Sequence, residues 1–247
     1  MDNAKLRPDT RQVWEHLAEH PQLKGFILIG GTALTLHIGH RVSEDLDFSC
    51  TEPHKHLPKA QIKALVRELA QQGVSLVLHQ DPIAMEEFAE AGLDLDNYQQ
   101  NFIASAGAGS AVKVSLVCYD PPMQELLPGK RRDPLRVANL KEIFATKAWV
   151  CSERNKTRDW IDLYVLITAH GFSFDDVYAV FNSVNRLPAF ASLCMRLRAC
   201  RVNASDEGYE SLMDKPPSVD ELRVFFNKEI DALERRLAQA AFAAAQR

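Results

Sequence analysis

Two carboxylates, those of Asp45 and Asp47, are separated by one residue where the polar stretch HRVSED meets the apolar segment LDFSC. The alternation in LDFSC predicts a short strand, and residues two apart on a strand point to the same face. Paired carboxylates on one face can hold Mg²⁺ or Mn²⁺ between them. We therefore interpret Asp45 and Asp47 as metal ligands.

A glycine pair lies upstream of these carboxylates. The run GFILIG (25–30) predicts a strand, TALTLHIGH (32–40) predicts a helix whose end is marked by Gly39, and Gly30-Gly31 joins the two. Two glycines let the backbone turn tightly, and the N–H groups at a helix start favour an anion such as a triphosphate. A metal ion beside that anion would bridge its oxygens and lower the pKa of an attacking hydroxyl.

Each of these patterns is a weak signal alone. A glycine pair before a helix is more often simple turn geometry, and D-x-D occurs by chance in surface loops. Their order is more specific, because a phosphate-binding turn followed within one helix by paired carboxylates gives a nucleotide and a metal ion adjacent sites. Ser43 lies between them, and it can cap the turn before the strand or hydrogen-bond a phosphate.

A second group of charged residues falls in segments with helical periodicity. Lys147 lies on the same inward stripe as Phe144 and Cys151, and Arg154 continues that stripe. An inward lysine needs an anion, whereas a lysine at the edge of the stripe extends its ammonium into water. The segment WIDLYVLI, which starts at residue 160, is apolar on every helical face except at its one aspartate.

That aspartate, Asp162, is predicted to be buried, and a buried carboxylate needs a partner. Arg158 lies one helical turn earlier and is placed to supply it. Asp162 therefore has two interpretations. It is either a structural partner of Arg158 or a residue that contributes to activity.

The GGT motif at 30–32 and the S-x-D-x-D-F motif at 43–48 resemble the signature of the DNA polymerase beta-like nucleotidyltransferase superfamily. The fuller GGTAL and HRxSxDLDF form resembles the AbiEii/AbiGii-type toxin family. Lys147, Arg154 and the RDxxDLY segment (158–164) are similar to that family's helical pattern. In some relatives the serine equivalent to Ser43 is a target of self-modification, which would make this residue regulatory.

The resemblance covers roughly residues 25 to 168 and implies a nucleotidyltransferase that moves a nucleoside monophosphate from an NTP to an acceptor hydroxyl with Mg²⁺ or Mn²⁺. The leading acceptor is a tRNA 3′ end, and the implied protein partner is a neutralising antitoxin. The implied catalytic residues are Asp45, Asp47, Lys147, Asp159 and Asp162. The implied nucleotide-binding residues are Gly30, Gly31, Thr32, Ser43, Lys147 and Arg154, and the metal ligands are Asp45 and Asp47.

One departure from the superfamily pattern concerns a third metal-binding acid. Many members carry it on a central strand in a sequence such as VKVD, whereas residues 112–115 of this chain read VKVS. Either two carboxylates and water suffice, or Asp120 or Asp159 completes the metal shell. The missing acid keeps open a nucleotide-binding module without catalysis. A small-molecule acceptor, as in antibiotic nucleotidyltransferases, is a further alternative that fold alone cannot exclude.

The expected fold class is α+β, with a nucleotidyltransferase domain of mixed sheet and helices (1–134), a helical domain (135–247) and the active site in the cleft between them. Helices are predicted at 9–20 and 59–72, a strand at 74–79, and a hairpin from NYQQNFIASA and AVKVSLVCY around the turn GAGS. A proline-rich connection, DPPMQELLPGKRRDP, follows. Beyond it the pattern is all-helical, with helix starts at Asn139, Ser173 and Ser218.

The 247 residues carry a net charge of −4, which gives no overall attraction to nucleic acid. Two basic clusters are candidates for local contacts: Lys130-Arg131-Arg132 with Arg136, and the face with Lys147, Arg154, Lys156 and Arg158. The polar N-terminus and the absence of a long apolar run predict a cytoplasmic protein with no membrane segment. The five cysteines have no CxxC pair and are predicted to be reduced, mostly buried thiols.

Overall fold

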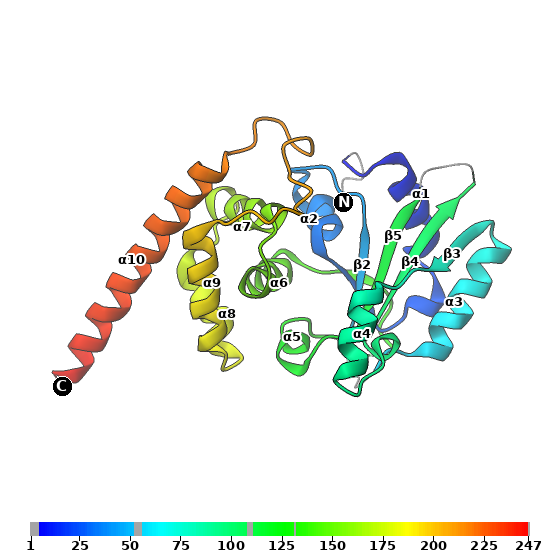
Figure 1. The fold of residues 1–247 in the computed structure, drawn as a ribbon, viewed down its shortest axis with the longest axis horizontal. Helices are drawn as coiled ribbons and strands as arrows, with labels where there is room; N and C mark the ends of the chain where they lie inside the picture. Colours follow the sequence, from blue (N-terminus) through cyan, green and yellow to red (C-terminus); the bar gives the residue numbers. More distant parts are fainter. Residues whose placement is uncertain (1–4, 52–55, 108–110, 131, 247) are drawn as a thin grey trace. The chain divides into compact units, whose positions relative to one another are not determined.

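The computed structural model describes residues 5–51, 56–107, 111–130 and 132–246. The chain divides into two compact units, Met1–Ile143 and Phe144–Arg247. The first contains a six-stranded mixed sheet with helices, and the described part of the second is helical (Figure 1). The expected α+β class is therefore confirmed.

The sheet has the strand order β3-β4-β5-β2-β1-β6. The central pair, β2 and β5, is parallel, whereas β1 with β2 and β4 with both of its neighbours are antiparallel. The predicted hairpin is thus present as β4 and β5, and residues 108–110 of its GAGS turn lie outside the described residues. The strands are β1 (Phe26–Ile29), β2 (Leu46–Cys50), β3 (Val74–Leu78), β4 (Gln99–Ala106), β5 (Val112–Val117) and β6 (Arg136–Val137).

Alternation along the strands separates a core face of the sheet from a polar face. Phe48, Phe102 and Val114 are buried on the core face, and Trp14 of helix α1 (Pro8–Leu17) stacks on Phe48 with ring centroids 6.4 Å apart. Asp47, next to Phe48, points to the opposite face because successive strand residues alternate. The register of the sheet therefore decides which polar side chains accompany Asp47.

The helices of the first unit follow the predicted periodicity where the sequence is amphipathic. Helix α3 buries Ile62, Leu65 and Leu69 at helical spacing, and Gly39 ends α2 in the left-handed conformation. Helices α4 and α5 were not expected, because one has no buried face and the other lies in the proline-rich connection. These helices are α1 (Pro8–Leu17), α2 (Gly30–Ile38), α3 (Lys59–Gln71), α4 (Pro82–Glu90) and α5 (Pro121–Glu125).

Three predicted helix starts are present as capping boxes. In each, the side chain of the N-cap residue accepts a hydrogen bond from the backbone N–H of the third helical residue. The carboxylate of that third residue in turn accepts a hydrogen bond from the backbone N–H of the N-cap. The pairs are Asn139 with Glu142, Ser173 with Asp176, and Ser218 with Glu221. The expectation of helices alone beyond residue 134 misses β6, which pairs with β1 in the sheet.

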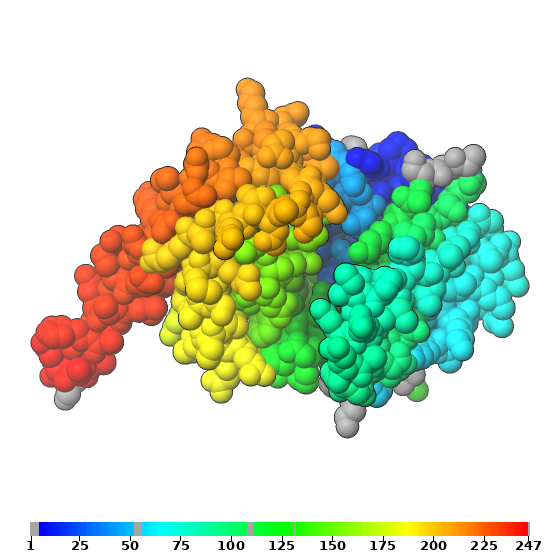
Figure 2. All heavy atoms as spheres, in the orientation of Figure 1, coloured from blue at the N-terminus to red at the C-terminus, as the bar shows by residue number. Residues whose placement is uncertain are grey.

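The second unit contains most of α6 and the remaining helices. Large buried side chains fill its core, among them Trp160, Phe181 and Phe226. The alanine-rich end of α10 is exposed over residues 238–246 and is coloured red in Figure 2. The helices are α6 (Leu140–Glu153), α7 (Thr157–Ala169), α8 (Phe174–Ser183), α9 (Leu187–Ala199) and α10 (Val219–Ala245).

Two expectations about the whole chain can be compared with the structure. All five cysteines are buried thiols that belong to no disulfide bond, as predicted, and burial raises the pKa of Cys194 and of Cys200 to about 11. Among the helices that the structure describes, none combines the length and apolar character that crossing a membrane requires.

Candidate functional site

The carboxylate of Asp47 lies against the backbone of Gly30. Asp47 is opposite Ile29, the last residue of β1, and Gly30 then starts α2 with φ of +73°. A Cβ built on residue 30 would be 2.7 Å from Oδ2 of Asp47, so this position requires glycine for its backbone conformation and for its lack of a side chain. The acidic side chain thus adjoins the start of a helix.

The adjoining Gly31 has a cation beside it. A Cβ on residue 31 would be 2.5 Å from Nη2 of Arg41 and 3.2 Å from Oγ of Ser43. Arg41 is 4% exposed and donates a hydrogen bond to the carbonyl oxygen of Val42 at 3.0 Å. Since helix N-termini and guanidinium groups both favour anions, the turn has the character of a phosphate site.

Arg41 was not among the residues singled out from the sequence. It does stand in the HRxSxDLDF motif, and that motif was the available signal. What the linear pattern could not show is that the chain after α2 folds back, so that Arg41 reaches Gly31.

Hydrogen bonds fix the loop that carries Ser43 and Asp45 onto α2. The hydroxyl oxygens of Thr32 and Ser43 are 2.8 Å apart, and Thr32 also donates to the carbonyl oxygen of Asp45. Asp45 immediately precedes β2 rather than lying on it. The structure therefore brings together the predicted residues of the first unit, which are Gly30, Gly31, Thr32, Ser43, Asp45 and Asp47.

The position of the missing third acid is occupied by Ser115, which lies opposite Asp47 in the parallel pairing of β2 with β5. Over the described residues, no set of three or more histidine, cysteine or acidic side chains could hold a metal ion. Asp120 is the N-cap of α5. Two carboxylates nevertheless fit Mg²⁺ or Mn²⁺, because these ions take hard oxygen ligands and complete their shell with water and substrate phosphates.

The predicted residues of the second unit form one buried ionic cluster. Nζ of Lys147 is 2.8 Å from Oδ1 of Asp159 and 2.7 Å from Oδ2 of Asp162, and Nε of Arg154 is 2.9 Å from Oδ2 of Asp159. Burial alone would raise the pKa of Asp159, but the charges of Lys147 and Arg154 outweigh it and lower that pKa. The cluster carries two positive and two negative charges, so it is neutral as a whole.

The expected pairing of Arg158 with Asp162 is wrong. Asp162 is fully buried, as predicted, but its partner is Lys147 from α6, and Arg158 pairs with Glu207 instead. Spacing along one helix identifies neighbours on that helix only. A lysine with a long stem on another helix can reach the same carboxylate.

Each predicted basic cluster contains side chains that form ion pairs: Arg136 in the first, and Lys147, Arg154 and Arg158 in the second. The guanidinium of Arg136 donates to both carboxylate oxygens of Glu142, at 2.7 and 2.6 Å, and Arg131 lies outside the described residues. In the second cluster, Lys147 and Arg154 pair with Asp159, and Arg158 pairs as described above. Neither cluster is therefore a simple band of unpaired positive charge.

Comparison with solved structures defines the class of fold. The chain is similar to JHP933 from Helicobacter pylori, with a TM-score of 0.50 and 18% identity over 96% of both chains. It is also similar to the nucleotidyltransferase toxin MenT4 from Mycobacterium tuberculosis H37Rv, with a TM-score of 0.52 and 16% identity, covering 91% of this chain and 85% of that one. The fold is that of nucleotidyltransferase toxins.

Sequence comparison gives the family. A protein-family model described as nucleotidyl transferase AbiEii toxin of type IV toxin–antitoxin systems matches residues 12–246. The chain therefore belongs to the AbiEii family of nucleotidyltransferases. An uncharacterised protein of Aquifex aeolicus (strain VF5) is 26% identical over 233 residues, which cover 92% of this chain and 96% of that protein.

Proposed function

We propose that this protein transfers a nucleoside monophosphate from an NTP to an acceptor hydroxyl, and that Asp45 and Asp47 hold the Mg²⁺ or Mn²⁺ that the reaction uses. The observation that carries the proposal is the close approach of Asp47 to Gly30. It sets a carboxylate beside a helix start, so a metal ion and a phosphate would have adjoining positions. An acidic pair with a purely structural role would not require a helix start beside it.

The triphosphate would be bound by the turn at the start of α2. The N–H groups of Gly30, Gly31 and Thr32 are at the positive end of the helix, and the guanidinium of Arg41 adds a full charge beside Gly31. The Ser43 hydroxyl supplies a further hydrogen bond. These groups stabilise the negative charge that develops on the departing phosphates.

The chemical step is an in-line displacement. The acceptor oxygen forms a bond to the α-phosphorus, the bond from that phosphorus to the oxygen bridging to the β-phosphate breaks, and pyrophosphate leaves. The acceptor's proton is released to solvent. A bound divalent ion would neutralise phosphate charge and lower the pKa of the attacking hydroxyl.

The ionic cluster of the second unit is proposed to serve the same reaction. Lys147 is held by Asp159 and Asp162, whereas the side chain of Arg154 is 54% exposed although its Nε is bonded to Asp159. We expect Arg154 to contact a phosphate and Lys147 to keep the two carboxylates in place. A direct phosphate contact by Lys147 would require it to leave one of them.

The proposed acceptor is the 3′ end of a tRNA, and the site of action is the cytoplasm. The proposed protein partner is a cognate antitoxin, as the type IV toxin–antitoxin family description implies. An acceptor of this kind presents a single-stranded end with a free hydroxyl.

One experiment tests the proposal as a whole. The purified protein is incubated with each α-labelled NTP, total tRNA, and Mg²⁺ or Mn²⁺, and label is followed in RNA, protein and small-molecule fractions. We expect label in tRNA, lost on chelation of the metal. Label in the protein that disappears in Ser43→Ala would instead assign self-modification, and label in no fraction with either metal would refute nucleotidyl transfer.

A further inference from the structure

A row of polar side chains continues from Asp47 across the neighbouring strands. Asp47 of β2 lies opposite Ser115 of β5, and Ser115 lies opposite Asn101 of β4. The N–H of His79, the residue after β3, donates to the carbonyl oxygen of Asn101 at 2.8 Å. Because directly opposed residues point to the same face of a sheet, these four side chains share the face that carries Asp47.

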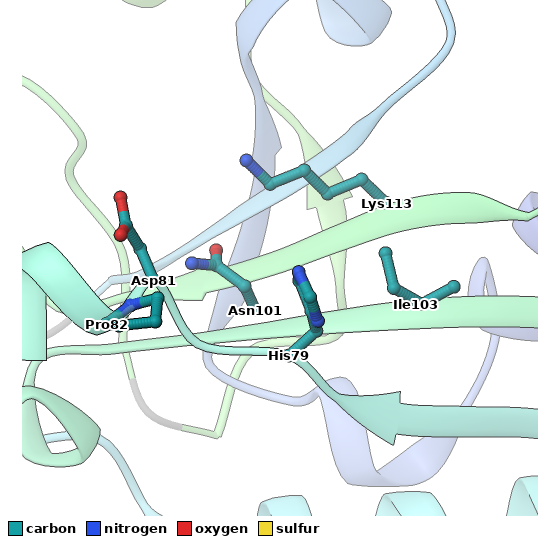
Figure 3. A pocket seen from close by; sticks show the side chains of 6 residues that line it. All are labelled: His79, Asp81, Pro82, Asn101, Ile103 and Lys113. Atoms are coloured by element: carbon teal, nitrogen blue, oxygen red, sulfur yellow. The ribbon is translucent and has the colours of Figure 1, made fainter.

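The row ends in a pocket of about 320 Å³ on this polar face (Figure 3). Adjacent strands are about 4.8 Å apart, so Asn101 is about two strand spacings from Asp47. One nucleotide can bridge that separation. The pocket is lined by His79, Asp81, Pro82, Asn101, Ile103 and Lys113.

Lys113 supplies the positive charge of the pocket. Lys113 precedes Val114, which pairs with Leu46. It therefore lies on β5, the strand next to the acidic pair. Its side chain is exposed, and it makes no hydrogen bond or ion pair with any residue that the structure describes. Figure 3 shows it extending over the sheet above Asn101. An ammonium in this state suits a phosphate, since the protein itself does not neutralise it.

The other side chains suit a nucleobase. The ring of His79 stands between Asn101 and Ile103 in Figure 3, and histidine rings stack on unpaired bases. Asn101 is 8% exposed, and its Oδ1 accepts a hydrogen bond from Nε2 of Gln99 at 3.1 Å, which fixes the orientation of the amide. An oriented amide can hydrogen-bond to the edge of a base.

The pocket also contains one carboxylate, that of Asp81. Its Oδ1 accepts the N–H of Ile83 at 3.0 Å and thereby caps α4. The negative charge is stabilised by the positive end of that helix. It therefore opposes a phosphate at Lys113 less than an uncompensated carboxylate would.

We propose that this pocket binds the 3′-terminal nucleotide of a single-stranded nucleic-acid acceptor, with Lys113 paired with its phosphate and its base stacked on His79. The inference rests on the proposed function, because the hydroxyl of that nucleotide is the attacking group. The pocket makes and breaks no bond. Lys113 and His79 bind the acceptor, whereas the turn at Gly30 binds the NTP.

The test measures binding of a short, 5′-labelled single-stranded RNA with a free 3′ hydroxyl, by fluorescence anisotropy, with no NTP or metal present. Lys113→Met should weaken binding about tenfold, because one phosphate contact is lost. For the same reason, the slope of the logarithm of the binding constant against the logarithm of the salt concentration should fall in magnitude by about one. His79→Ala should weaken it roughly 5- to 150-fold through lost stacking. The matched control Lys63→Met, at an exposed lysine of α3, should bind like the wild type.

The outcomes separate this inference from the function on which it rests. Wild-type protein that binds the RNA but transfers no nucleotide would contradict the function and leave the pocket supported. Variants of Lys113 and His79 that bind the RNA as tightly as the wild type would overturn the pocket, as would a wild type that binds no RNA. NTP affinity, measured in parallel, should be unchanged in Lys113→Met; a loss of NTP affinity alone would assign Lys113 to the triphosphate instead.

Discussion

Oδ2 of Asp47 lies 2.7 Å from the point that a Cβ on Gly30 would occupy. This contact links the end of β1 to the second residue of β2, which are paired in antiparallel register. The two positions therefore constrain each other. Residue 30 must lack a side chain so that the carboxylate can lie beside the helix start, and it must tolerate φ of +73°.

Gly30→Ala should destabilise the protein and impair metal binding, because the new methyl group displaces the Asp47 carboxylate. Gly73→Ala is the matched control, since Gly73 has φ of +81° with nothing within 4 Å of its Cβ position. Both variants lose about 1–2 kcal/mol from the left-handed backbone conformation. We expect only Gly30→Ala to lose more than this, and to lose Mg²⁺ affinity in calorimetry. Equal effects of the two variants would show that the close approach is unimportant.

Lys147→Met should destabilise the second unit strongly. The substitution leaves Asp159 and Asp162 without the ammonium that both contact, and breaking a buried ion pair in this way costs about 3–5 kcal/mol. Lys228→Met, at an exposed lysine of α10, should change the free energy of unfolding by less than about 0.5 kcal/mol. Urea unfolding measures both, and a stable Lys147→Met would refute a structural role.

The same substitution should change how stability depends on pH. In the wild type the pKa of Asp159 is lowered, so its stabilising contribution is complete above the unfolded pKa of about 3.9 and is lost as the pH falls through the folded pKa. Without Lys147 that pKa rises, because burial is then opposed by Arg154 alone. The difference in unfolding free energy between wild type and variant should therefore shrink as the pH falls from 7 toward 4. A pH-independent difference would contradict this.

The sequence predicts most of the fold because its local signals agree with the tertiary structure. The strand LDFSC, the hairpin and the three helix starts at Asn139, Ser173 and Ser218 are all present. Helix α4 was not predicted from the sequence, and the reason is physical. It has no buried residue, so it lacks the periodic apolar stripe from which helices are recognised.

The sequence predicts the site less completely, because its contacts join distant segments. The GGT and D-x-D motifs identify residues that the structure does bring together, but the approach of Arg41 to Gly31 depends on the path of the loop after α2. The Lys147–Asp162 pair depends on the packing of two helices, and the pairing of Asp47 with Ser115 depends on sheet register. None of these three follows from spacing along the chain.

Ser115→Asp should restore the third acid at the position opposite Asp47. Three carboxylates attract a divalent cation more strongly than two, so Mg²⁺ affinity should rise by about tenfold or more. Metal-free stability should fall, because like charges directly opposite on a sheet repel. In the control variant Ser115→Asn, the new side chain has nearly the same shape as aspartate but no charge. This variant should show neither effect. A Ser115→Asp variant with unchanged Mg²⁺ affinity would show that the metal is not bound beside Asp47.

The acidic pair itself gives the most direct test. Asp47→Asn keeps the shape of the side chain and its place beside Gly30, but it removes one of the two negative charges that would face the cation. Mg²⁺ affinity should collapse, and transfer should fall by several orders of magnitude, since each 1.36 kcal/mol of lost charge stabilisation is tenfold in rate. Metal-free stability should stay level or rise slightly, because two neighbouring carboxylates repel until a cation arrives. Asp214→Asn, the same change at an exposed aspartate, should alter none of these quantities. If Asp47→Asn lowers the metal-free melting temperature sharply, or leaves a measured transfer rate untouched, then Asp47 serves the fold and the proposed metal site is wrong.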